Sequence, residues 1–219
     1  MQRVLEPEVM DTLQEAIEYD AMDFTEVNTA FAQRAIELGP QSVGIVLDAG
    51  TGTARIPILI CQQSPQWQII GIDLAQHMLC IGFKNVKQAG LQKQIHLELV
   101  DSKQLPYLQG EFDMAISNSL VHHLPEPLPF LLEIKRVLKP NGAILIRDLI
   151  RPVDEASVDR IVNSIGTEYS EHQQQLFRDS LHAAFTLDEV SELVQKSGLE
   201  GVQVYQSSNR HWTAERKYA

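Results

Sequence analysis

Two acidic residues and a glycine-rich loop follow apolar runs in the first half of this 219-residue chain. The run Val46-Leu47 ends in Asp48, and Ala49-Gly50-Thr51-Gly52-Thr53-Ala54 follows it. A second run, residues 67–72, ends in Asp73. Glycines at alternate positions let the backbone approach a ligand closely. The free backbone amides at the start of the next helix then point toward a negatively charged group of that ligand. The spacing predicts a nucleotide-type cofactor site on two neighbouring parallel strands.

The residues around this loop do not favour a dinucleotide. Counting from Gly50, the third glycine of the motif G-x-G-x-x-G falls at position 55, which is Arg55. A pyrophosphate beside Asp48 would meet a like charge, at a cost of about 1 kcal/mol or more at close range. A cofactor with a cationic amino-acid head group fits the aspartate better, so a nicotinamide-dependent reductase is disfavoured.

Several motifs of the chain, taken in order, resemble those of class I S-adenosylmethionine (SAM) methyltransferases. The resemblance covers roughly residues 40–150, and its elements are residues 48–54, Asp73, Asp101 and residues 118–123. One departure is Ala54, where the family usually has a third glycine. Because alanine is only one methyl group larger, we expect a small local adjustment and no loss of cofactor binding.

The resemblance implies a role for each cofactor residue. Asp48 and the glycine loop would hold the methionine part of SAM, and Asp73 would accept hydrogen bonds from both ribose hydroxyls. The residues implied to bind SAM and its product S-adenosylhomocysteine (SAH) are Asp48, Gly50, Thr51, Gly52, Asp73, Leu74, Met78, Asp101, Ser102, Asn118 and Tyr19. Leu74 and Met78 would flank the adenine, and Asp101 with Ser102 would meet its amino group. Taken singly, Asp73 could instead be a helix cap and Asp101 a turn acid.

Two histidines follow the fourth predicted strand, where the resemblance to small-molecule and quinone methyltransferases places the transferred methyl group. An imidazole at this point could take a proton from a hydroxyl or phenol. We expect His123 to be the catalytic residue and keep His122 as the second candidate. The alternative is that both histidines only pack the loop, because methyl transfer can proceed by in-line placement alone.

Three further residues are candidates for binding the acceptor. Arg147 and Arg151 end the fifth predicted strand and could bind an acidic substrate. An ion pair with Asp148 or with an acid of the lid is the alternative for both. His182 lies in a segment whose helical spacing could line a pocket or pack the lid.

Alternating apolar strands and amphipathic helices must position these residues. The pattern predicts an α/β, Rossmann-like, doubly wound, mostly parallel seven-stranded sheet with an antiparallel C-terminal strand and a helical lid. The expected strands are residues 44–48, 67–73, 95–100, 112–118, 143–148, 202–205 and 212–216, the fifth entered by a turn at 140–142. The expected helices are 7–19, 23–38, 53–63, 75–89, 128–138, 154–165, 170–184 and one that begins at the capping box 186–189. We expect a single domain made of an N-terminal helical cap (1–40), a SAM-binding core (41–150), a lid insertion (151–185) and a C-terminal helix and hairpin (186–219).

Composition excludes several classes of protein. The net charge is −11, and residues 1–40 carry nine acidic and two basic side chains, so a nucleic-acid partner is not expected. Apolar runs are too short to span a bilayer and no secretory leader is recognisable, so we expect a cytoplasmic location without membrane insertion. Cys61 and Cys80 make no disulfide framework, and no Cys/His cluster has zinc spacing, so no metal site is expected.

We therefore expect a SAM-dependent methyltransferase that acts on a small-molecule acceptor and releases SAH. Methylation of a protein or ribosomal target is one alternative, and a non-catalytic SAM- or SAH-binding protein is another. The identity of the acceptor depends on lid and loop residues that vary while the cofactor site stays fixed. No feature of the sequence predicts an oligomeric state.

Overall fold

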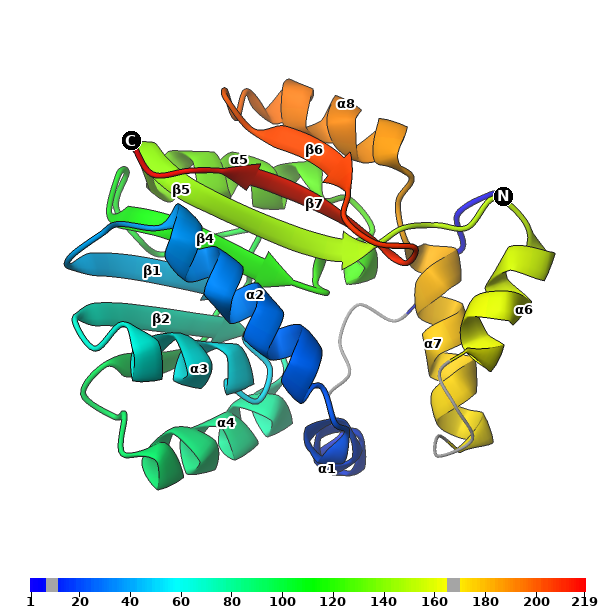
Figure 1. Ribbon diagram of the computed structural model, residues 1–219, viewed down its shortest axis with the longest axis horizontal. Coiled ribbons are helices and arrows are strands. Elements are labelled where there is room, and N and C mark those ends of the chain that lie inside the picture. The colour runs from blue at the N-terminus through cyan, green and yellow to red at the C-terminus, as the bar shows by residue number, and fades with distance from the viewer. Residues whose placement is uncertain (7–11, 165–169) are drawn as a thin grey trace.

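The computed structural model describes residues 1–6, 12–164 and 170–219 (Figure 1). Its sheet has the strand order β3-β2-β1-β4-β5-β7-β6. The strands are β1 (Gly44–Ala49), β2 (Trp67–Asp73), β3 (Ile95–Leu99), β4 (Phe112–Asn118), β5 (Leu138–Leu149), β6 (Gln203–Gln206) and β7 (His211–Arg216). Strands β1 to β5 run parallel, and β7 is antiparallel to both β5 and β6. The predicted sheet is therefore confirmed.

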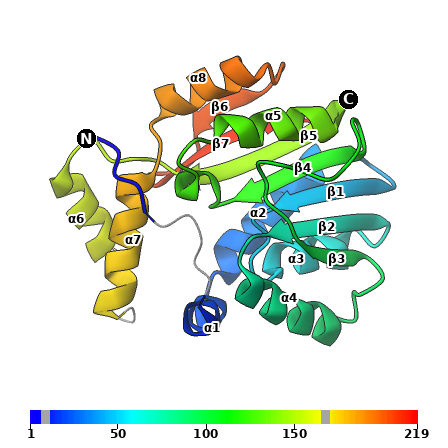
Figure 2. The same cartoon turned by 180° about the vertical axis from the view of Figure 1, so that it is seen from behind.

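Helices cover both faces of the sheet (Figures 1 and 2). They are α1 (Leu13–Ala21), α2 (Thr25–Leu38), α3 (Arg55–Gln63), α4 (Gln76–Ala89), the short 3₁₀ helix η1 (Val121–His123), α5 (Leu128–Val137), α6 (Glu155–Asn163), α7 (Glu171–Ala183) and α8 (Leu187–Ser197). One apolar cluster joins α2, α3 and α4 to the sheet, and another joins α5 and α8 to its opposite face. Two-sided burial is the reason why the central strands are apolar throughout.

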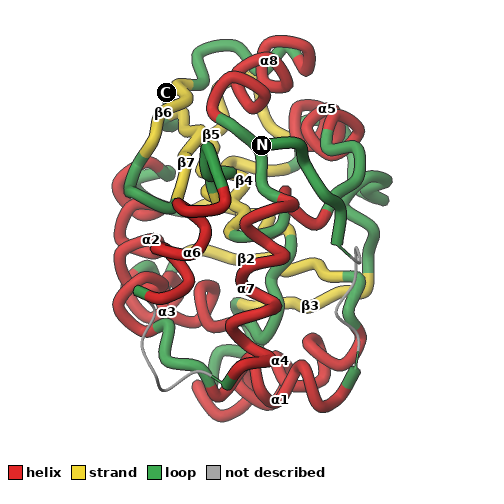
Figure 3. Tube along the Cα trace, turned by 90° about the vertical axis from the view of Figure 1, so that its right-hand side faces the viewer, coloured by secondary structure: helices red, strands yellow, loops and turns green. Residues whose placement is uncertain are grey.

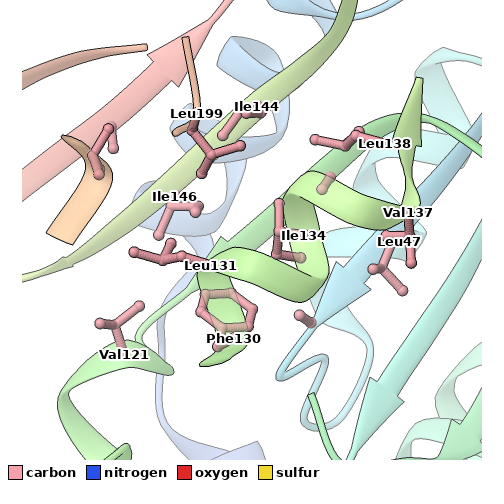
Figure 4. Close-up of a cluster of buried hydrophobic side chains, with 14 of the residues drawn as sticks. Leu47, Val121, Phe130, Leu131, Ile134, Val137, Leu138, Ile144, Ile146 and Leu199 are labelled. Carbon is pink, nitrogen blue, oxygen red and sulfur yellow. The ribbon is translucent and has the colours of Figure 1, made fainter. Parts of the chain in front are cut away.

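The side chains of neighbouring strand residues alternate between the two clusters. Leu47 and Ile144 pack toward α5, where Phe130 and Ile134 meet them (Figure 4). Val46, which precedes Leu47, belongs to the cluster on the other face. This period of two fixes the register of each strand and hence the place where each strand ends.

Helices α6 and α7 lie beyond the carboxyl ends of the parallel strands, and Figure 3 views the molecule from that side. The two helices share a small apolar cluster that contains Leu149, Val158, Val162, Leu181 and Ala184. Helix α1 lies at the same edge of the sheet (Figure 1). Ligands of open α/β sheets bind at this edge, so the extra helices stand beside the expected site.

The observed bounds differ most from the predicted ones in two places, β5 and α1. Strand β5 begins at Leu138, because Leu138 pairs with Phe112 and a register shift before Met114 carries the chain past the expected turn at 140–142. Helix α1 begins at Leu13 behind a capping box made by Thr12 and Glu15. Residues 7–11 of the first predicted helix and residue 165 of the sixth lie outside the described residues. In the described part of the chain, none of the helices is both long and apolar enough to cross a bilayer.

Candidate active site

The loop between β1 and α3 has the backbone that its glycines predict. Gly50 and Gly52 have φ values of +74° and +53°, which favour glycine. The amides of Gly50 and Thr51 both donate to the Ile72 carbonyl at the end of β2, over 2.9 Å each. A Cβ on Gly50 would lie 3.0 Å from the side chain of Leu120. The loop is therefore held closely between β2 and the segment that follows β4.

Asp73, at the end of β2, binds this loop directly. One carboxylate oxygen accepts from the Gly52 amide over 2.8 Å, and the other accepts from the Ala75 amide over 2.9 Å. Burial raises the pKa of Asp73 above its usual value. The carboxylate thus fixes the glycine loop and the turn before α4, and Asp73 also lines the adjacent pocket.

An open pocket of about 780 Å³, measured with the solvent at its mouth, lies at the carboxyl ends of β1, β2 and β4. The predicted site residues that line it are Tyr19, Gly50, Gly52, Asp73, Leu74, Met78, Ser102, Asn118 and His123. Its other lining residues are Ile72, Ala75, Val100, Ser119, Leu120 and Leu124. The pocket therefore combines a polar rim, built by the loop and Asp73, with apolar walls.

Three predicted cofactor residues lie outside this lining. Asp48 is only 2% exposed, and its carboxylate accepts a hydrogen bond from the Thr51 hydroxyl over 2.6 Å. Burial raises the pKa of Asp48 to about 7. Asp101 accepts from the Lys103 amide over 2.9 Å and pairs with the same residue's ammonium group over 3.0 Å. Asp48 and Thr51 thus support the loop from behind, and Asp101 has the contacts of a turn acid.

Helix α1 is anchored beside the pocket by a polar cluster. Both carboxylate oxygens of Asp20 accept from the Arg55 guanidinium, over 2.9 and 2.8 Å, and the Asn85 amide donates to Asp20 over 3.1 Å. Tyr19, the preceding residue, lines the pocket. At the position where a dinucleotide-binding loop has its third glycine, this chain therefore has Arg55, whose side chain holds α1 in place.

The two histidines of η1 have different environments. His122 is 4% exposed, and its Nδ1 lies 2.5 Å from an Asp148 oxygen on β5. Burial alone would lower the pKa of His122, but the Asp148 and Glu6 carboxylates outweigh it and raise that pKa above its usual value. His123 lines the pocket, and its Nδ1 lies 3.0 Å from Glu6 Oε1. Only His123 of the pair is thus exposed to a ligand in the pocket.

The first six residues of the chain reach this site, which sequence reasoning missed. The Arg3 guanidinium lies 3.8 Å from the centroid of the Phe185 ring. It donates to the carbonyls of Ala183, Pro125, His122 and Leu124 over 2.6 to 3.0 Å. These contacts join residues more than a hundred positions apart, and no local pattern marks them.

The three residues predicted to bind the acceptor are dispersed. Arg147 donates to the Asn118 side chain over 3.0 Å and therefore touches the pocket wall. Arg151 pairs with Glu189 of α8 over 2.7 Å. His182 pairs with a carboxylate of α6, that of Glu155, over 3.2 Å. Arg151 thus pairs with an acid of α8 and not with Asp148 or an acid of the lid, whereas the pair of His182 joins the two lid helices.

Comparison with known proteins agrees with this geometry. A family model described as a methyltransferase domain matches residues 40–215. A demethylmenaquinone methyltransferase from Lactobacillus johnsonii is 34% identical over 109 residues, which are 49% of this chain and 45% of that protein. A ubiquinone/menaquinone biosynthesis C-methyltransferase from a Geobacter species is 32% identical over 117 residues, 53% of this chain and 50% of that protein. The chain thus spans about half the length of these curated relatives.

Solved structures share the fold at low identity. A SAM-dependent methyltransferase from Aquifex aeolicus superposes with a TM-score of 0.68 at 18% identity, covering 95% of this chain and 99% of that one. A Haemonchus contortus phosphoethanolamine N-methyltransferase, solved with phosphomonomethylethanolamine and SAH, gives 0.69 at 20% identity over 90% of this chain and 44% of that one. The strand order, the loop bound to Asp73 and the family match lead to one conclusion: the chain belongs to the class I SAM-dependent methyltransferases.

Proposed function

We propose that this protein transfers the sulfonium methyl group of SAM to an apolar, ring-containing small molecule that carries an ionisable hydroxyl, of the quinol or phenol type. The observation that carries the proposal is the composition of the pocket. Its apolar walls, including Leu120 and Leu124, run from the glycine loop to His123. The apolar side chains of Leu120 and Leu124 beside His123 favour an acceptor that has an apolar ring next to its polar group.

The reaction would be an in-line displacement. The acceptor nucleophile takes the methyl group, the sulfonium becomes the neutral thioether of SAH, and the acceptor loses a proton. Placement and exclusion of water supply most of the rate, because methyl transfer needs little else once the reacting atoms are aligned. We assign the contact with the acceptor to His123, the histidine on the pocket wall, and a positioning role to the buried His122.

The curated relatives support this class of acceptor, since their names refer to demethylmenaquinone and to ubiquinone/menaquinone biosynthesis. A large protein target fits less well. The outer side of η1 is covered by residues 1–6 and by α7, through the bonds of Arg3 to the His122 and Ala183 carbonyls. An extended polypeptide would have to displace this cover.

A transfer assay tests the proposal. Tag-free protein is incubated with SAM labelled in its methyl group and with a reduced short-chain naphthoquinone, a catechol, phosphoethanolamine or a ribosome-containing cell fraction. We expect label in the organic extract of the naphthoquinol or catechol reaction, with an equal yield of SAH. Label confined to precipitated protein or RNA would contradict the small-molecule acceptor. SAH binding without turnover on any acceptor would favour a non-catalytic binding protein.

A further inference from the structure

Glu6, His122 and His123 bring three potential ligand atoms within 4.8 Å of one another. Glu6 Oε1 lies 3.4 Å from His122 Nε2 and 3.0 Å from His123 Nδ1. The two histidines belong to η1, whereas Glu6 comes from the N-terminal segment. Spacing along the sequence therefore predicts no such cluster, and the fold alone assembles it.

Two atoms of this cluster lack a hydrogen-bond partner. Among the described residues, Glu6 Oε1 and His123 Nδ1 are buried and make no hydrogen bond, although they lie only 3.0 Å apart. Buried polar atoms are nearly always paired. At 3.0 Å the two atoms are at ion-pair distance, yet neither has a hydrogen bond. A cation between them would satisfy both.

The distances suit a small cation. Metal–ligand bonds of about 2.0–2.2 Å in tetrahedral geometry place ligand atoms roughly 3.3–3.6 Å apart. The separations of 3.0 and 3.4 Å from Glu6 Oε1 lie close to this range. Asp148 adds a further requirement of such a site. It holds His122 through Nδ1, which leaves Nε2 to face Glu6. Carboxylates orient metal-binding histidines in this way.

The charges also leave room for a cation. Glu6 and Asp148 are two buried or half-buried carboxylates beside the histidines, and Arg3 is the cation that reaches them from the N-terminal segment. Arg151 is already paired with Glu189. With both imidazoles neutral, as metal binding requires, the group of Glu6, Asp148 and Arg3 carries one net negative charge.

We propose that Glu6, His122 and His123 hold one divalent transition-metal ion of the zinc type, with an open coordination position toward the pocket that His123 lines. Two nitrogen donors and one carboxylate favour first-row transition ions over magnesium or calcium. The role of the ion rests on the proposed function: bound to the acceptor oxygen, it would promote release of the hydroxyl proton to solvent before the methyl group arrives.

Metal titration tests the site without reference to turnover. Tag-free protein is freed of metal and titrated with Zn²⁺ against a chromophoric chelator, and with Co²⁺ while its visible absorption is recorded. We expect one equivalent of each ion to bind. Glu6→Gln should weaken binding at least tenfold, and Asp148→Asn about 10- to 100-fold through the orientation of His122. Glu6→Gln serves where Asp148→Asn does not fold, because Glu6 lies outside the sheet.

His96→Gln is the matched control, since His96 is an exposed histidine on β3. Binding that is absent, that survives Glu6→Gln, or that falls equally in His96→Gln would overturn the proposal. SAH affinity, measured on the same samples, separates the two hypotheses. If the protein binds SAH but no metal ion, only the proposed metal site is contradicted. If it binds the ion but not SAH, only the proposed function is contradicted.

Discussion

The amide of Gly52 donates to the Asp73 carboxylate over 2.8 Å, so the glycine loop and the acid that ends β2 form one unit. The same carboxylate accepts from Ala75 and its residue lines the pocket. Helix α4 begins without a side-chain cap, so Asp73 braces the loop and the turn before α4, which is compatible with a role as ribose acceptor. A carboxylate that is already oriented by two amides needs little reorganisation when a ligand binds.

Replacement of Asp73 by alanine should weaken SAH binding by at least about tenfold, because two charge-assisted hydrogen bonds to ribose would be lost, each worth about 1.5–3 kcal/mol. Titration calorimetry at pH 8 measures the change. Asp188→Ala, which removes an exposed acid on α8, is the control and should leave the affinity unaltered. A loss of SAH affinity below about threefold for Asp73→Ala would mean that Asp73 only braces the glycine loop and the turn before α4.

The affinity for SAH should rise with pH up to neutrality. Burial raises the pKa of Asp48 to about 7 in the unliganded protein, and the cationic amino group of the ligand favours the ionised form. Binding below pH 7 therefore releases a proton and is weaker. At pH 6 about one Asp48 in ten is ionised, so we expect roughly tenfold weaker binding than at pH 8. The Asp48→Asn variant should bind SAH weakly, and its affinity should no longer depend on pH in this range. If the variant keeps the wild-type pH profile, the pH dependence belongs to another group.

Loss of the Arg55–Asp20 pair should loosen α1 over the pocket. The pair is partly exposed, so its removal costs about 1 kcal/mol or less in global stability. That amount is enough to make local opening of α1 about fivefold more frequent. We expect faster hydrogen exchange at residues 19–24 in Arg55→Ala, with SAH restoring part of the protection. Glu192→Gln breaks an exposed pair with Lys196 on α8 and is the control. Unchanged exchange at residues 19–24 would show that the apolar contacts of α1 and the Asn85–Asp20 bond hold it without Arg55.

Sequence reasoning located the elements of the core because their signals are local. Strands β2 and β4 have the predicted bounds, since each is a mostly apolar run that ends at a polar residue. Strand β5 was predicted too short, because the pairing of Leu138 with Phe112 depends on a neighbouring strand and leaves no periodic trace. The pocket lining likewise contains Asp73 and Asn118, whose positions follow from strand ends, whereas Asp48 and Asp101, predicted by the same rule, lie outside it.

The parts of the site that could not be predicted depend on contacts between distant segments. Arg3 and Glu6 reach η1 from the start of the chain, and neither lies in a motif. The sequence offers the neighbouring arginines as partners for Asp148, yet Asp148 binds His122. The sequence contains several basic residues that could pair with each acid. Packing of the folded chain decides which of them becomes the partner.

Ala54 gives the last prediction, because it occupies the left-handed region with a φ of +62° at the position where the family usually has glycine. Ala54→Gly relieves about 1–2 kcal/mol of backbone strain. It loses about 0.8 kcal/mol of methyl burial and about 0.5–1 kcal/mol to the freedom of an unfolded glycine. These terms nearly cancel, so urea unfolding should show a change in the free energy of unfolding below about 1 kcal/mol, with SAH affinity unaltered.

Ala54→Val puts a β-branched residue at positive φ in a fully buried position, and we expect it to destabilise the protein by more than about 2 kcal/mol. A valine variant as stable as the wild type would contradict the strained backbone at residue 54, and a glycine variant stabilised by more than about 2 kcal/mol would mean that the strain exceeds the usual cost of this conformation.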